Sequence, residues 1–167
     1  MSKKIIFLVL LAVVLFIVSI IFFQRKIPSE VRISPQMSQL THEAKVKIGG
    51  KEILVEIAET PEEKAKGLSG KTLLAENEGL LFSFAQETLP AFWMKDMKIA
   101  LDLIWIDKEK IIYINENVSP PLSGQKEANL PLYRPPQPIN YVLEVNAGFS
   151  QTNGIKVGDS VDLTNLE

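Results

Sequence analysis

The chain has 167 residues, a formal net charge of −2 and no cysteine. The absence of cysteine excludes disulfides, thiolate catalysis, zinc–thiolate sites and iron–sulfur clusters. A single histidine, His42, stands alone. It does not indicate a metal site, because transition metals are usually held by several N or S donors. We therefore expect no metal and no cofactor.

The charge is unevenly distributed along the chain. Residues 1–42 carry five basic residues and one acidic residue, whereas residues 43–167 carry 13 basic and 19 acidic residues. A nucleic-acid-binding domain would be expected to present a basic face. The acidic composition of the larger part therefore predicts no nucleic-acid partner.

The first 26 residues predict a membrane anchor. Residues 5–23 are apolar except for Ser19, and basic residues flank this run on both sides. About twenty apolar residues suffice to span a bilayer, whereas a cleaved signal peptide has an apolar core of about 7–15 residues and small residues at its exit. Here the exit, Ile20–Phe23, is bulky. We predict an uncleaved, single-pass anchor in the cell membrane, with the C-terminal part extracytoplasmic.

Residues 27–43 predict a polar linker, and residues 44–167 predict a single compact β-rich domain. The linker contains Pro28 and Pro35 and has no apolar period. The domain begins with two alternating stretches, residues 44–48 and 52–57, separated by Gly49-Gly50. A Gly-Gly pair between two such stretches is typical of a β-hairpin.

The sequence TPEEKAKGL, which begins at Thr60, predicts a helix of about two turns. Thr60 suits the N-cap, Pro61 suits the first helical position and Glu63 completes a capping box. Gly67 is placed to end the helix in the left-handed αL conformation.

The remainder of the domain is rich in strand signals. Short aliphatic and aromatic runs predict strands at residues 79–84, 91–94, 100–106, 110–118, 140–145 and after Gly158-Asp159. A second short helix is expected before Gly154, and a proline-rich loop spans residues 118–138. These elements predict an α+β fold, mostly antiparallel β in a barrel-like or curled sheet with one or two short helices, preceded by one N-terminal transmembrane helix.

Several segments of the sequence resemble domain-of-unknown-function family 192, also called uncharacterised protein family 0127. They are KAKGLSGKTLL, EGLLFSF, FWMKDMKIALDLIWID, YVLEV and GIKVGD, and together they lie within residues 51–163. The central segment follows the family pattern at Trp93, Met94, Lys95, Leu101, Asp102 and Asp107. It departs at Asp96, Met97 and Ala100, where Asn, Thr and Pro are usual. The resemblance implies a small, mostly β domain, often exported or anchored, and no known reaction.

Asp102 interrupts an apolar strand, so its carboxylate needs an explanation. Strand alternation places Asp102 on the same face as Ile104 and Ile106. Burying an unpaired carboxylate would cost several kcal/mol. If residues 92–94 pair with 101–103, Lys95 becomes its partner. One interpretation is structural, a salt bridge or a carboxylate that caps turn amides. The other places Lys95, Asp102 and the Trp93 ring at the rim of a pocket.

Glu144 interrupts the strand YVLEV in the same manner, and it is either a solvent-facing residue or an acid/base partner of Asp102. The ligand-binding candidates are Trp93, Lys95, Asp96, Asp102 and Glu144. We expect a binding module for a small polar ligand, glycan or peptide at the cell envelope. The alternatives are an acid/base enzyme using Lys95, Asp102 and Glu144, including a Ser69–Lys95 variant, and a scaffold that binds another protein through loop 118–138.

Overall fold

The computed structural model describes residues 44–166. The predicted membrane anchor at residues 5–23 and the linker at 27–43 lie outside these residues. Within the described range, no helix has the length and apolar character needed to cross a bilayer.

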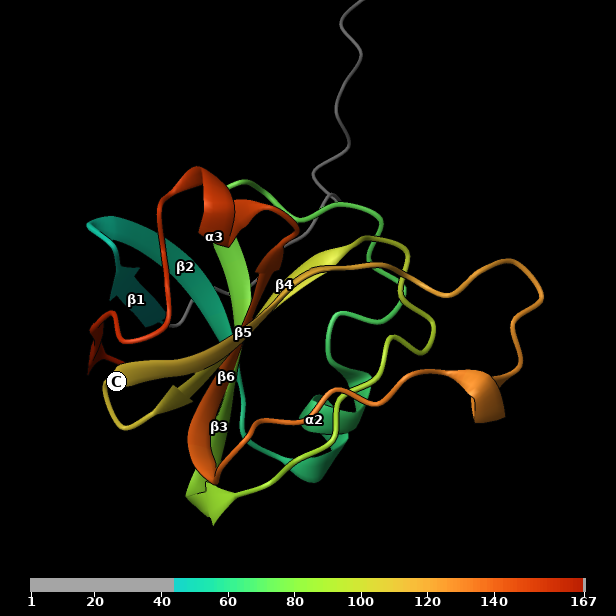
Figure 1. Cartoon of the computed structure of the whole chain (residues 1–167), viewed down its shortest axis with the longest axis horizontal. Coiled ribbons are helices and arrows are strands. Elements are labelled where there is room, and N and C mark those ends of the chain that lie inside the picture. The colour runs from blue at the N-terminus through green and yellow to red at the C-terminus, as the bar shows by residue number, and fades with distance from the viewer. Residues whose placement is uncertain (1–43, 167) are drawn as a thin grey trace, which may run out of the picture. The chain divides into compact units, whose positions relative to one another are not determined.

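The described residues form one seven-stranded sheet with two short α-helices (Figure 1). The spatial order of the strands is β5-β4-β6-β3-β2-β1-β7, and all neighbours are antiparallel except β2 and β3. Helix α2 lies in the crossover between those two parallel strands. The strands are β1 (Ala44–Ile48), β2 (Lys51–Ala58), β3 (Glu78–Thr88), β4 (Leu101–Asp107), β5 (Lys110–Val118), β6 (Ile139–Asn146) and β7 (Val161–Asn165), and the helices are α2 (Pro61–Lys66) and α3 (Phe149–Thr152).

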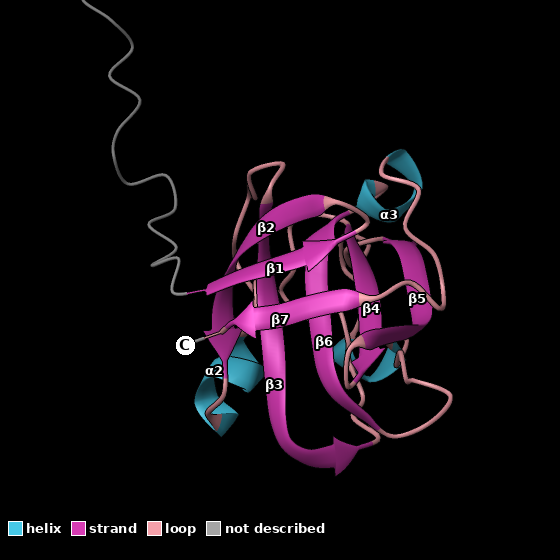
Figure 2. Ribbon diagram, turned by 90° about the vertical axis from the view of Figure 1, so that its left-hand side faces the viewer, coloured by secondary structure: helices cyan, strands magenta, loops and turns pink. Residues whose placement is uncertain are grey.

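The sheet curls into a half-barrel, as predicted. In Figure 2, β1 and β7 run across β3 and β6, so the sheet turns through a large angle along its width. Its two edges meet at a bridge between Lys110 and Ser160. There the amide of Ile111 donates to the carbonyl oxygen of Asp159 at 3.0 Å, and the amide of Val161 donates to that of Glu109 at 2.8 Å.

Both faces of the central strands are buried, which explains why β4 is apolar almost throughout. An inner cluster draws side chains from all seven strands and from α3, among them Val46, Ile53, Leu81, Ile104, Ile111, Leu143, Val161 and Phe149. An outer cluster covers the other face of β3, β4 and β6 and includes Leu80, Phe82, Met94, Met97, Leu103, Trp105 and Val142. The segments between β2 and β4 supply much of this outer cover.

The locally encoded elements agree with the sequence. Gly49 and Gly50 form the predicted turn between β1 and β2, with φ of 56° and 75°. At α2 the Thr60 hydroxyl accepts from the Glu63 amide at 3.2 Å, and the Glu63 carboxylate accepts from the Thr60 amide at 3.0 Å. The capping box is therefore confirmed. Gly67 ends the helix with positive φ but with ψ of −138°, so the predicted αL conformation is wrong in its ψ.

The predicted strand at residues 91–94 is wrong, and so is its pairing with 101–103. Only Phe92 forms a bridge, with Tyr133, through amide–carbonyl bonds of 2.9 and 2.8 Å. Strand β4 already has β5 on one side and β6 on the other, so no edge is free to receive another strand. Phe92 and Met94 instead pack in the outer cluster, whereas Ala91 and Trp93 are exposed.

The proline-rich loop is tied to the domain near its middle. It contains one short 3₁₀ turn, η1 (Glu127–Asn129). The bridge between Phe92 and Tyr133 and an ion pair between Lys95 and Glu127 connect the loop to the segment before β4. In Figure 1 this loop, drawn in orange, projects beyond the sheet.

Candidate functional site

The two buried acidic residues of the sheet, Asp102 and Glu144, point to its opposite faces. Residues directly opposite each other on neighbouring strands share a face. Glu144 lies opposite Leu103 of the outer cluster, whereas Asp102 lies opposite Val145 of the inner cluster. Asp102 and Glu144 therefore do not form the acid/base pair considered from the sequence.

Asp102 is fully buried and serves as a hydrogen-bond acceptor for three backbone amides. Its Oδ1 accepts from the amides of Asn117 at 2.8 Å and Gly148 at 3.0 Å, and its Oδ2 accepts from the amide of Ser150 at 2.9 Å. The last two bonds cap the start of α3, and the first fixes the end of β5. The expected pairing with Lys95 is wrong, and the alternative of a carboxylate that caps turn amides is confirmed.

Glu144 is equally deep but lacks such partners. Its residue exposure is 6%, and its Oε2 has no hydrogen-bond partner among the described residues. Burial raises the pKa of this carboxyl to about 8, because desolvation penalises the charged form. At neutral pH the group is therefore mostly protonated and carries one O–H donor.

Glu144 lines a half-open cavity of about 160 Å³ on the outer face of the sheet. One wall is aromatic, and another is the end of α2 with the turn that follows it. Phe82 and Phe92 pack edge to face with ring centroids 4.7 Å apart, which fixes the aromatic wall. The lining residues are Lys64–Ser69, Phe82, Phe84, Pro90–Trp93, Lys95, Met97 and Glu144.

Lysine side chains surround the cavity, and two of them rest on its aromatic rings. Lys64 Nζ lies 4.6 Å from the ring centroid of Phe84, and Lys95 Nζ lies 5.4 Å from that of Trp93. Lys95 Nζ also lies 2.8 Å from Glu127 Oε2. This hydrogen bond, together with the charge of the carboxylate, raises the pKa of Lys95. Lys95 is therefore a permanent cation at the cavity and is not a general base.

Asp96 is a structural residue of the turn that follows Trp93. Its φ is 58°, and its carbonyl oxygen accepts from the Gly70 amide at 3.0 Å. Aspartate and asparagine tolerate this left-handed conformation better than other non-glycine residues. That tolerance explains why an Asp can stand where the resemblance has Asn. Asp96 is not among the residues that line the cavity.

The Ser69–Lys95 dyad considered from the sequence is not supported by the contacts. The Ser69 hydroxyl donates to the main-chain carbonyl of Lys95 at 3.1 Å, which fixes the turn after α2 to the segment before β4. Ser69 still lines the cavity through this turn. Of the five sequence candidates, the structure brings Trp93, Lys95 and Glu144 together at one cavity and leaves Asp96 and Asp102 outside it.

Sequence reasoning did not identify Lys64, Glu127 or the phenylalanines of this cavity as site residues. Phe82 does belong to the outer cluster, and it also faces the cavity. Lys64 and Phe84 meet only because α2 crosses over the end of β3, and Glu127 reaches Lys95 from a distant loop. These contacts are tertiary, and no local spacing in the sequence indicates them.

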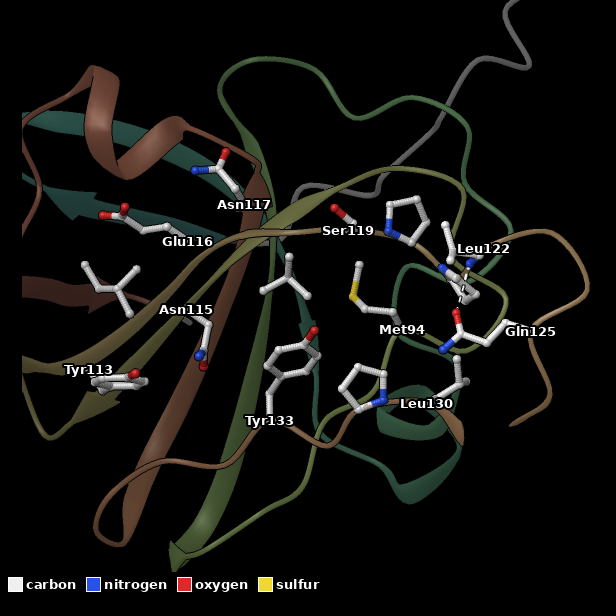
Figure 3. Close-up of a pocket in the computed structure, with 15 residues that line it drawn as sticks. Met94, Tyr113, Asn115, Glu116, Asn117, Ser119, Leu122, Gln125, Leu130 and Tyr133 are labelled. Atoms are coloured by element: carbon white, nitrogen blue, oxygen red, sulfur yellow. Dashed lines mark hydrogen bonds between the residues drawn. The ribbon is translucent and has the colours of Figure 1, made fainter. Parts of the chain in front are cut away.

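A second hollow lies between β5 and the proline-rich loop (Figure 3). This groove is larger, at about 590 Å³, and Tyr113, Asn115 and Tyr133 stand along it. Two of its side-chain amides, those of Asn115 and Gln125, already form hydrogen bonds within the protein. Asn115 Oδ1 accepts from Trp105 Nε1 at 2.8 Å, and Gln125 bonds the Leu122 amide and the Asn129 carbonyl at 3.0 and 3.1 Å. The Glu144 cavity is therefore the stronger candidate, since its deepest polar group is unengaged.

Comparison with known proteins agrees with the resemblance in the sequence. The model of a family described as uncharacterized ACR, DUF192, matches residues 44–163. A crystal structure of a protein of unknown function from Novosphingobium aromaticivorans is 30% identical, with a TM-score of 0.63 over 71% of this chain and 83% of that one. A Sinorhizobium meliloti structure, described as a proposed transcription regulator, is 29% identical, with a TM-score of 0.64 over 71% and 92%. Among curated proteins, none matches this sequence.

Proposed function

Since the chain belongs to the DUF192 family of uncharacterized proteins, we propose from the geometry of its own cavity that the domain is a binding module for a small polar ligand. The ligand inserts a compact group between the aromatic wall and the end of α2 and meets Glu144 at the bottom.

The observation that carries this proposal is the unsatisfied oxygen of Glu144. A buried polar group without a hydrogen bond costs about 1–3 kcal/mol in proteins, so such groups are rare unless they serve a purpose. Glu144 Oε2 has no partner among residues 44–166, and the side chain lines an open volume rather than a packed core. A ligand that hydrogen-bonds this carboxyl would remove the cost on binding.

The dimensions of the cavity limit what enters it. Its volume is about 160 Å³. An apolar cavity of about 150 Å³ holds benzene, so this one accommodates a ring or a short branched group of similar size. A larger ligand, such as a glycan or a peptide, would place one terminal group inside. Trp93, which is 44% exposed, could then contact the remainder.

The acid/base enzyme is less well supported than binding. That alternative needs Lys95, Asp102 and Glu144 in one site, whereas Asp102 is saturated by three amides on the opposite face of the sheet. The remaining pair consists of a carboxyl with a raised pKa and a lysine whose pKa is raised further by Glu127. The described lining of the cavity contains no histidine and no second carboxyl to act with Glu144.

A position at the membrane is the second part of this proposal. The apolar run at residues 5–23 supports an uncleaved anchor that holds the domain outside the cytoplasm. Alkaline carbonate should therefore leave the protein in the membrane pellet, and its intact mass should include residues 1–23. A soluble product that begins near Gln24 would contradict the anchor without affecting the binding proposal.

Binding is tested with full-length protein in lipid nanodiscs and a set of benzene-sized alcohols, amides, acids and amines. The chain has two tryptophans, so the indole resonances form a simple readout. Members of the set should shift the indole of Trp93, at the cavity, more than that of the fully buried Trp105. Glu144→Leu should abolish the shifts, and Glu116→Gln, in the groove, should preserve them. Absence of any shift at Trp93 would refute the proposal.

A further inference from the structure

The charge around the cavity is opposite in sign to the net charge of the domain. Residues 43–167 carry an excess of six acidic residues. The charged residues that line the cavity are nevertheless Lys64, Lys66, Lys95 and Glu144. Glu127 neutralises the charge of Lys95 through the 2.8 Å ion pair. When Glu144 is protonated, Lys64 and Lys66 therefore make the net charge around the cavity positive.

Each element packed around Glu144 contributes to this balance. Helix α2 brings Lys64 and Lys66, and the segment before β4 brings Lys95 with Glu127 behind it. Strand β3 contributes the uncharged rings of Phe82 and Phe84. No acidic side chain other than Glu144 lines the cavity within the described part of the chain.

On the basis of the proposed binding function, we propose that the group entering this cavity is a carboxylate on a small aromatic or branched aliphatic body. The neutral carboxyl of Glu144 donates a hydrogen bond to the ligand carboxylate, and the lysines supply the compensating positive charge. The apolar body of the ligand packs against the aromatic wall. A carboxyl–carboxylate pair that shares one proton is stable where two charged carboxylates would repel each other.

An ammonium group would fit the same volume less well. It would enter beside Lys64 and Lys66 and be repelled by them. An ion pair with this group would also require Glu144 to ionise in a buried position, where desolvation favours the neutral acid. The rings of Phe84 and Trp93, which could attract a cation, already lie under Lys64 and Lys95.

Three probes with the same ring separate these possibilities: benzoate, benzyl alcohol and benzylamine. Their affinities are measured at pH 6.5 with full-length protein in nanodiscs, from the indole shift of Trp93. Benzoate should bind at least about tenfold more tightly than benzylamine, with benzyl alcohol between them. A tighter affinity for benzylamine would overturn the carboxylate inference and leave the binding function standing. No shift with any probe would refute the binding function itself.

The pH dependence and two variants identify the groups responsible. Benzoate affinity should fall as pH rises through about 8, because Glu144 then ionises and repels the ligand. Glu144→Gln should retain benzoate binding and remove this fall in affinity.

Lys64→Gln should weaken the affinity for benzoate several-fold without changing the affinity for benzyl alcohol. Lys110→Gln, at the distant sheet edge, should change neither affinity. If Glu144→Gln abolishes benzoate binding while the variant melts as the wild type does, or if Lys64→Gln leaves benzoate unchanged, the inference fails.

Discussion

Asp102 and Glu144 lie on neighbouring strands at almost the same level of one sheet, and both are buried. Asp102 accepts three amide hydrogen bonds, whereas Glu144 Oε2 has no partner in the described residues. The same chemical group is therefore satisfied within the fold on the inner face and keeps an unpartnered oxygen beside a cavity on the outer face. Burial alone does not distinguish the two environments, but hydrogen-bond satisfaction does.

The two carboxyl groups differ because different chain segments pack on the two faces of the sheet. Two chain segments, the end of β5 at Asn117 and the start of α3 at Gly148 and Ser150, converge on the start of β4 and turn their amides toward Asp102. Glu144 faces aromatic side chains and the end of α2, which offer it no amide within hydrogen-bond reach. Four variants or conditions test this difference between the two carboxyl groups.

Removal of the Asp102 carboxylate should have the largest effect. Asp102→Ala strands three buried amides, and since hydrogen bonds to charged groups contribute about 1.5–3 kcal/mol each, the free energy of unfolding should fall by at least about 3 kcal/mol. Denaturant unfolding measures the loss. Asp162→Ala is the matched control, because Asp162 bonds Thr164 only at the surface. Equal, small losses for both variants would show that the three amides find other partners.

Removal of the Glu144 carboxyl should raise the free energy of unfolding, whereas removal of the Asp102 carboxylate lowers it. Glu144→Leu replaces an unsatisfied buried carboxyl by an apolar side chain in contact with the outer cluster. The free energy of unfolding at pH 7 should rise by about 1–3 kcal/mol. Glu116→Leu, at an exposed position of β5, controls for a general effect of leucine and should change stability by less than about 0.5 kcal/mol. If Glu144→Leu instead lowers the free energy of unfolding, then Glu144 stabilises the fold as Asp102 does.

The pH dependence of stability should report Glu144 directly. Its pKa rises from 4.5 to about 8 on folding, so the unfolded chain loses this proton first. Its contribution is most favourable below pH 4.5 and is progressively lost as pH rises toward 8. Within that window it lowers the free energy of unfolding by about 1.4 kcal/mol per pH unit. Subtracting the profile of Glu144→Gln isolates the slope, and parallel profiles would show that Glu144 is ionised when folded.

The exposed ion pair should matter least for stability. The side chains of Lys95 and Glu127 are 40% and 53% exposed, so water screens the pair and its contribution to stability is small. Glu127→Gln should lower the free energy of unfolding only slightly, and high salt should remove most of the difference. A larger loss would show that this ion pair stabilises the fold as strongly as Asp102 does.

The elements that the sequence predicts well are those that local chemistry determines. The capping box of Thr60 and Glu63 and the turn at Gly49-Gly50 lie within a few residues of their partners. Alternation then identifies the strands on either side. Residues 91–94 carry an equally apolar pattern, but they cover the sheet instead of joining it, because both edges of β4 are taken. Neighbour order in the sheet is a tertiary property that strand signals do not contain.

The candidate site was predictable only in part for the same reason. An acidic residue within an apolar strand is conspicuous in a sequence, so the sequence alone identifies both Asp102 and Glu144 as candidates. Which of them would be satisfied depended on loops up to 48 residues away. Lys64 and Glu127 carried no signal at all, since surface lysines and glutamates are ordinary. Their relevance comes from the rings and charges that they meet.

The closure of the sheet has a consequence for how this protein behaves at high local concentration. Edge strands with unpaired amides and carbonyls recruit other chains and seed aggregation. Here the start of β5 is occupied by its bridge to Ser160, and its other end leads into Pro120-Pro121. Proline has no amide proton to offer a neighbouring strand. A domain crowded against identical copies on a surface would thus resist edge-to-edge pairing along β5 and keep its cavity available.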